Sequence, residues 1–319
     1  MKFGLQLYSF TWPGGPEAIG PTLARAVRAA DRAGFHSIWV MDHFWQIGGP
    51  QAELEPMLEG WTTLGFMAAH SERARLGLMV GGVHYRHPGL WVKAATTLDV
   101  LSGGRGWLGI GAGWHQAESE GLGFPFPPTK TRFDMLEETL QIAAGMWEGE
   151  RGSEDSFHGR RFQAARLLNV PQSLTRPRVP ILIGGGGEKR TLRLVARYAD
   201  ASNLFGEPEQ LRRKYAVLAE HCEAVGRPFE DIERTTLQSV TLAGPSAFRS
   251  VRQTPAELVD RFGRLAAAGA QHIIINSSEA HDPHFIETLS EEVFPQLRRG
   301  EGPTPAPESV GANAQDKQP

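Results

Sequence analysis

Two side chains that are suited to catalysis stand next to each other where a buried strand is expected to end. Residues 36–45 read His-Ser-Ile-Trp-Val-Met-Asp-His-Phe-Trp, and the apolar run from Ile38 to Met41 is typical of a strand covered on both faces. Asp42 and His43 follow directly, where parallel strands of α/β folds present their ligand-binding groups. An isolated Asp-His pair more often caps a turn and packs in a core, so the rest of the chain must decide its role. We take Asp42 and His43 as the candidate catalytic pair.

A run of four glycines leads from another expected strand straight into a helix. Gly184, Gly185, Gly186 and Gly187 follow an apolar segment and precede Glu188, Lys189 and Arg190. Main-chain N–H groups of glycines can approach an anion closely, and a helix start adds a favourable dipole. We predict a phosphate site here, with Lys189 or Arg190 adding charge; a tight loop is the alternative. The Gly-Lys-Ser/Thr ending of an ATP-binding loop is missing.

Residues 109–113, Gly-Ile-Gly-Ala-Gly, form a second glycine-rich strand end. This pattern alone is weak, but so little side-chain volume leaves room for a flat ring beside the barrel axis. Gly113 and Trp114 are therefore candidate ring contacts. Glu118 has a weaker case, because it could equally be a solvated helix end. The other histidines show no metal-ligand spacing, and no metal site is predicted.

Strands that alternate with helices would bring these residues together. The expected strands span residues 2–8, 38–41, 75–83, 106–113, 179–183, 201–205, 234–242 and 272–276. The expected helices span 19–33, 54–70, 87–101, 132–147, 188–198, 208–225, 255–268 and 283–297. Eight such repeats predict a (β/α)8 TIM barrel of the α/β class, with a doubly wound open sheet as the alternative. In a barrel, the strand ends would place these residues, Gly82 and Val83 around one mouth.

The alternation lapses between residues 115 and 178, a segment that includes the helix expected at 132–147, and we interpret this segment as an insertion after the fourth strand. Residues 1–300 are otherwise expected to form a single domain. Residues 301–319 are polar and rich in proline, so we expect a disordered tail that is dispensable for stability.

Composition excludes several classes of partner. The 319 residues carry a formal net charge of −3, which offers no basic field for nucleic acid or an anionic membrane. Cys222 is the only cysteine, so an internal disulfide and a cysteine-based metal cluster are excluded. No export signal or long apolar span is recognised, and we expect a cytoplasmic protein that acts on a small-molecule substrate.

Taken together, the chain resembles the bacterial luciferase-like monooxygenase superfamily, and within it the branch that uses the deazaflavin coenzyme F420. The resemblance covers nearly all of residues 1–300. Five segments carry it: residues 3–6 (Phe-Gly-Leu-Gln), 37–43 (Ser-Ile-Trp-Val-Met-Asp-His), 81–88 with Gly-Gly-Val and His-Pro, 108–114 (Leu-Gly-Ile-Gly-Ala-Gly-Trp) and 180–186 (Pro-Ile-Leu-Ile-Gly-Gly-Gly).

The resemblance implies an oxidoreductase in which a flat cofactor lies across the carboxyl-terminal mouth of the barrel, with its phosphate on the glycine loop. It implies that Asp42 contacts the cofactor and that His43 is a proton donor or ring contact. It also implies a homodimer and a non-prolyl cis peptide at Gly82-Val83. Several F420-dependent dehydrogenases carry a Glu where this chain has Trp114, which puts alcohol oxidation by that acid in doubt.

Other functions stay open at this point. An FMN-dependent monooxygenase would need the same mouth and anion loop. A non-enzymatic flavin-binding protein, or a sugar-phosphate aldolase or isomerase, ranks lower, since Lys93 falls in a helix rather than at a strand end. We expect alanine at Asp42 or His43 to preserve folding and to impair the redox reaction.

Overall fold

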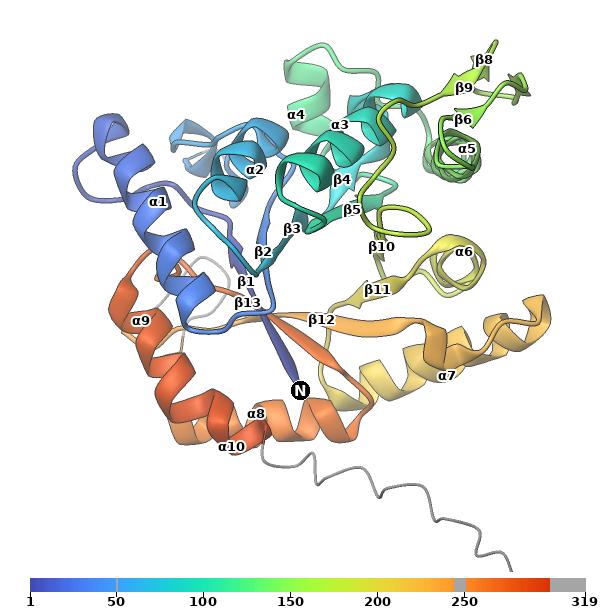
Figure 1. Cartoon of the computed structure of the whole chain (residues 1–319). Helices are drawn as coiled ribbons and strands as arrows, with labels where there is room; N and C mark the ends of the chain where they lie inside the picture. The colour runs from blue at the N-terminus through green and yellow to red at the C-terminus, as the bar shows by residue number, and fades with distance from the viewer. Residues whose placement is uncertain (50, 244–250, 299–319) are drawn as a thin grey trace, which may run out of the picture.

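A closed barrel of parallel strands forms the centre of the computed structural model, which describes residues 1–49, 51–243 and 251–298 (Figure 1). The strands are β1 (Lys2–Leu7), β2 (Ser37–Val40), β3 (Arg75–Leu78), β4 (Gly81–Gly82), β5 (Gly106–Gly111), β10 (Ile181–Gly184), β11 (Ala201–Leu204), β12 (Glu233–Ser239) and β13 (His272–Asn276). β3 and β4 are two parts of the third strand. Pairing of β10 with β5 closes the ring, so the predicted (β/α)8 barrel is confirmed.

Helices surround the strands. They are α1 (Pro16–Arg32), α2 (Gly60–Ala68), α3 (Pro88–Leu101), α5 (Thr129–Met146), α6 (Thr191–Tyr198), α7 (Pro208–Val225), α8 (Pro255–Ala267), α9 (Pro283–Thr288) and α10 (Phe294–Arg298), with a π-helical segment at Leu289–Val293. Local sequence sets several boundaries. In α7, Glu207 forms a capping box, Pro208 occupies the first turn and Gly226 ends the helix in the left-handed conformation.

The segment after β5 contains more than an insertion. A short helix, α4 (Gln116–Gly121), follows the strand, and α5 then packs on α3 at the position of the fourth barrel helix. The additional part is small: β6 (Gly152–Ser153) pairs with β9 (Leu167–Leu168), and β7 (Phe157–His158) pairs with β8 (Gln163–Ala164). These pairs lie outside α5 in Figure 1. The expected tail at 301–319 lies outside the described residues.

Two apolar clusters stabilise the barrel. The larger one lies between strands and helices, and the smaller one fills the barrel interior with Trp39, Met79, Trp107, Leu182, Ala201 and Ile274. Trp39 and Trp107 meet edge to face with ring centroids 6.1 Å apart. Because these side chains fill the interior, a ligand has room only at the ends of the barrel. No described helix combines the length and hydropathy needed to cross a bilayer.

Candidate active site

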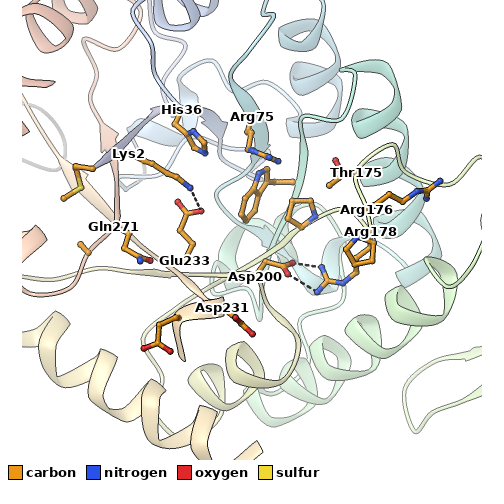
Figure 2. A pocket seen from close by; sticks show the side chains of 16 residues that line it. Lys2, His36, Arg75, Thr175, Arg176, Arg178, Asp200, Asp231, Glu233 and Gln271 are labelled. Carbon is orange, nitrogen blue, oxygen red and sulfur yellow. Dashed lines mark hydrogen bonds and ion pairs between the residues drawn. The ribbon is translucent and has the colours of Figure 1, made fainter. Parts of the chain in front are cut away.

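The described residues form cavities at both ends of the barrel. The cavity at the amino-terminal end, about 730 Å³, is shown in Figure 2, where acidic and basic side chains stand side by side. Lys2 pairs with Glu233 at 3.2 Å and Arg178 pairs with Asp200 at 2.5 Å. These charges compensate one another, and this end of a barrel usually serves stability. The candidate active site is therefore the cavity at the carboxyl ends of the strands.

That second cavity has a volume of about 590 Å³ and is formed by most of the barrel strands. Of the predicted site residues, His43, Gly113, Trp114, Gly184, Gly185, Gly186 and Gly187 line it. Lys189 and Arg190 line an adjoining groove that shares Gly186 and Gly187 with the cavity. The structure places Asp42, Gly82 and Val83 behind the cavity wall, where all three are buried.

His43 is held by a carboxylate from a distant part of the chain. Its Nδ1 lies 2.9 Å from Oε2 of Glu118, which belongs to α4 and is fully buried. A carboxylate only accepts hydrogen bonds, so Nδ1 carries the proton in the neutral ring and Nε2 is the free acceptor. Nε2 has no hydrogen-bond partner within the described chain, and His43 lines the cavity. The ring is thus oriented to exchange a proton with a bound molecule.

Glu118 also fixes the backbone around His43. Its Oε1 accepts hydrogen bonds from the main-chain N–H groups of Phe44 at 2.6 Å and Trp45 at 2.8 Å, and Oε2 accepts one from the Tyr85 hydroxyl. Burial alone would raise the pKa of Glu118, but the hydrogen bonds from His43, Tyr85 and Trp45 lower it to about 2. The carboxylate therefore stays ionised and holds the imidazole in one orientation.

Asp42 is part of a buried ion-pair network rather than of the cavity surface. Its Oδ2 accepts hydrogen bonds from Arg86 at 2.8 Å and from the main-chain N–H of Gly82 at 3.2 Å. Arg86 also donates to Glu59 at 2.7 Å. Asp42 thus ties the end of β2 to the end of the third strand, directly behind the wall that carries His43.

Small residues form one wall of the cavity. A Cβ atom on Gly184 would lie 2.7 Å from Val80, and one on Gly111 would lie 3.2 Å from the same side chain. Gly113 adopts φ +76°, and a Cβ there would lie 2.5 Å from Nδ1 of His84. Gly111 and Gly184 therefore make room for Val80, which lines the cavity with them, and Gly113 makes room for His84.

The cis peptide predicted at Gly82-Val83 is in the wrong place. The non-prolyl cis bond joins Met79 and Val80, between β3 and β4. We expected a glycine within the bond to relieve crowding. The space for Val80 is instead provided by Gly111 and Gly184 on neighbouring strands.

The glycine loop and its adjoining groove contain the basic side chains. Arg190 pairs with Asp134 at 2.9 Å, and Lys214 pairs with Glu188 at 2.9 Å. Lys189 makes no such interaction within the described residues. Helix α6 begins at Thr191, three residues later than predicted, because residues 188–190 form a turn. Lys189 is therefore the basic residue most available for an anion.

Sequence reasoning gave too little weight to three residues. The sequence gives Glu118 a weak case beside the alternative of a solvated helix end, and it assigns no role to Tyr85 or Arg86. The only local signal in the sequence for a role of Glu118 is that it follows Trp114 by four residues. Within the described residues, no cluster of His, Cys, Asp and Glu has the arrangement of a metal site.

Known proteins resemble the chain over almost its whole length. It is 28% identical over 320 residues to an F420-dependent glucose-6-phosphate dehydrogenase of Beutenbergia cavernae, covering 85% of this chain and 92% of the relative. Among solved structures, an F420-dependent secondary alcohol dehydrogenase with an F420-acetone adduct has a TM-score of 0.77 at 19% identity, covering 93% and 99% of the two chains. EDTA monooxygenase from Chelativorans sp. BNC1 reaches a TM-score of 0.80 at 16% identity, covering 95% of each chain.

These two structural similarities establish the fold. The sequence profile of the luciferase-like monooxygenases matches residues 1–299, which contain the barrel, the cavity, His43 and the glycine loop. The chain therefore belongs to the luciferase-like monooxygenase family.

Proposed function

We propose that this protein is an F420-dependent oxidoreductase that exchanges a hydride between the deazaflavin and a small organic substrate. The predicted oxidoreductase class and cofactor are borne out by the relatives named as F420-dependent dehydrogenases. The observation that carries the proposal is the position of His43, which lines a glycine-walled cavity and is oriented by a buried carboxylate.

The residues present fit such a cofactor. Val80 and the glycines at 81, 111, 113 and 184 line the cavity together, and this wall of small residues would accept a planar ring. Gly186, Gly187 and Lys189 would hold a phosphate at the start of α6, where main-chain N–H groups and the helix dipole favour an anion. His43 lines the same cavity.

When bound, F420 supplies or accepts the hydride, so two electrons pass between it and the substrate. The protein itself must transfer the proton that accompanies the hydride. Nε2 of His43 accepts that proton when the substrate is oxidised and returns it when the substrate is reduced. Glu118 stabilises the imidazolium form, and the ring of Trp114 meets the imidazole edge to face, with ring centroids 5.5 Å apart.

A fluorescence titration of the cofactor-free protein with F420 and, separately, with FMN tests the cofactor. We expect micromolar binding of F420. Micromolar binding of FMN without binding of F420 would overturn the proposal and favour a monooxygenase that uses reduced flavin and oxygen.

We also propose a cytoplasmic location and a homodimeric state. The single cysteine, Cys222, is buried and unpaired, which suits a reducing compartment. The homodimer follows from the family resemblance. Light scattering of the purified protein would test it.

A further inference from the structure

The chemistry of the cavity lining limits what the substrate can be. Within the described residues, the lining includes no Asp, Glu, Lys or Arg, and His43 is its one ionisable side chain. The uncharged polar side chains are Gln6, Thr129, Thr191, Asn203, Ser239 and Asn276. A charged group placed here would lose its hydration without gaining an ionic partner.

Basic side chains around the mouth are committed elsewhere. Arg86 pairs with Asp42 and Glu59. Arg132 donates to the carbonyl oxygens of Ala112 and Pro127, and its guanidinium stacks on Phe126 with 3.9 Å to the ring centroid. Arg86 is thus paired with two carboxylates, and Arg132, which has no carboxylate partner among the described residues, does not line the cavity.

The basic side chains of the adjoining groove also have partners or a proposed role. Arg190 and Lys214 are paired with Asp134 and Glu188. Lys189 is free within the described structure, but it lies at the glycine loop that holds the cofactor phosphate in the proposed function. A second phosphate, belonging to a substrate, would find no lysine or arginine among the side chains that line the cavity.

The rim of the cavity is apolar and open to solvent. Trp114 is 63% exposed and Phe205 is 62% exposed, although large hydrophobic side chains are usually covered. Both line the cavity together with Ile47 and Phe133. Exposed aromatic side chains at the mouth of a pocket indicate an apolar ligand that covers them.

The polar side chains deeper in the cavity are uncharged. Asn203 is 1% exposed, and its Oδ1 accepts a hydrogen bond from Thr235 at 2.9 Å. Its Nδ2 has no partner within the described chain and so can donate to an uncharged oxygen in the cavity. An amide donor of this kind suits a carbonyl or hydroxyl group on the cofactor ring or on a substrate.

From these observations, and resting on the proposed function, we infer that the substrate is an uncharged, mainly apolar molecule and not a sugar phosphate. The name of the Beutenbergia cavernae relative specifies glucose 6-phosphate. The described cavity of this chain lacks the cations that a phosphate dianion requires. Specificity is assigned to Trp114 and Phe205 at the rim.

The test begins with the protein saturated with F420, with saturation shown by fluorescence. Reduction of F420 is then measured with cyclohexanol, glucose and glucose 6-phosphate; glucose separates the effect of charge from that of polarity. We expect kcat/KM for cyclohexanol to exceed that for glucose 6-phosphate by about 100-fold or more, since the charged group is desolvated without a partner. The highest kcat/KM with glucose 6-phosphate would overturn the inference and leave the proposed function intact. Absence of F420 binding would overturn both.

A binding measurement decides the matter even if none of these compounds is oxidised. Calorimetric titration of the F420-bound protein compares 2-naphthol with 2-naphthyl phosphate, which share the same ring. We expect 2-naphthol to bind at least about 10-fold more tightly, and Trp114→Ala to weaken its binding more than Trp114→Phe does. Tighter binding of the phosphate ester, or equal affinity of the two variants and the wild type for 2-naphthol, would contradict the inference.

Discussion

Glu118 Oε2 lies 2.9 Å from His43 Nδ1, although 75 residues separate the two in the sequence. One residue follows the second barrel strand and the other belongs to the short helix after β5. The same carboxylate accepts the N–H groups of Phe44 and Trp45. The tautomer of the imidazole and the path of its backbone are thus set by a single side chain.

Replacing Glu118 by Gln should impair catalysis through His43. The amide keeps the size of the side chain but cannot stabilise an imidazolium, so we expect kcat to fall roughly 10- to 100-fold and its pH profile to shift. Steady-state kinetics from pH 5.5 to 9 measure both. Glu120→Gln on the same helix is the matched control, since Glu120 is exposed and accepts a hydrogen bond from Gln116. Unchanged kinetics of Glu118→Gln at every pH would remove this role.

Replacing His43 by Ala should lower kcat by about 100-fold or more, the range expected for loss of a general acid or base. F420 affinity should change less, because the glycine loop is untouched. Fluorescence titration and turnover, measured on the same preparation, separate the two effects. Wild-type turnover of His43→Ala would exclude the residue from the mechanism.

Asp42→Ala should destabilise the fold, in contrast to the expectation from sequence alone. The substitution leaves the partly buried Arg86 without one of its two carboxylates and Gly82 without its acceptor. Removing one partner of a buried ion pair typically costs about 3–5 kcal/mol, and Asp42→Asn should cost less because it keeps an oxygen acceptor. Urea unfolding at pH 7.5 measures the free energies. Equal stability of Asp42→Ala and wild type would contradict this assignment.

Lys189→Ala should weaken F420 binding by roughly 10-fold, which corresponds to about 1.4 kcal/mol. Arg190→Ala is the control, because Arg190 is already paired with Asp134. Fluorescence titrations at low and high salt should show a reduced salt dependence for Lys189→Ala alone. The opposite ranking of the two variants would place the anion elsewhere.

Stability should fall as the pH is lowered from about 6.5 to about 4. Burial is the main reason that the pKa of His36 falls from 6.5 to about 4, and His84 behaves in the same way. The unfolded chain binds protons near pH 6.5 that the folded chain takes up only near pH 4, so folding is fully favoured above this window and weakened within it. Urea unfolding of His36→Gln between pH 7.5 and 5 should show a smaller slope, by up to about 1 kcal/mol per pH unit. His158→Gln, at an exposed site, should match the wild type.

The barrel was predictable because its strands are short apolar runs at regular intervals. The bounds of β13 and α7 agree with the prediction, since His272–Asn276 is a buried run and Pro208–Val225 has clear end signals. Helix α2 begins at Gly60 rather than near Leu54, because residues 52–54 form a separate 3₁₀ turn. Helical periodicity alone does not distinguish such a turn from the helix that follows it.

The site could be predicted where a residue type with a known chemical use directly follows an expected strand, as at His43 and the four glycines. The partners of those residues were not. Glu118 contacts His43, which is 75 positions away in the sequence, and Arg86 contacts Asp42, which is 44 positions away. Local residue spacing cannot predict contacts between residues so far apart in the chain. The direction of the Asp42 side chain was equally hidden, because adjacent residues at the end of a strand can face opposite sides of the wall.

The Val80 side chain packs over two glycines, Gly111 and Gly184, which belong to two different strands. A methyl group on Gly184 would collide with Val80 at 2.7 Å, and one on Gly111 would make a tight contact with it at 3.2 Å. We therefore expect substitutions at positions 80 and 184 to depend on one another: alanine at Gly184 should be tolerated better once position 80 carries a smaller residue. Val80→Ala is then the expected permissive step through which the wall of this cavity can be reshaped.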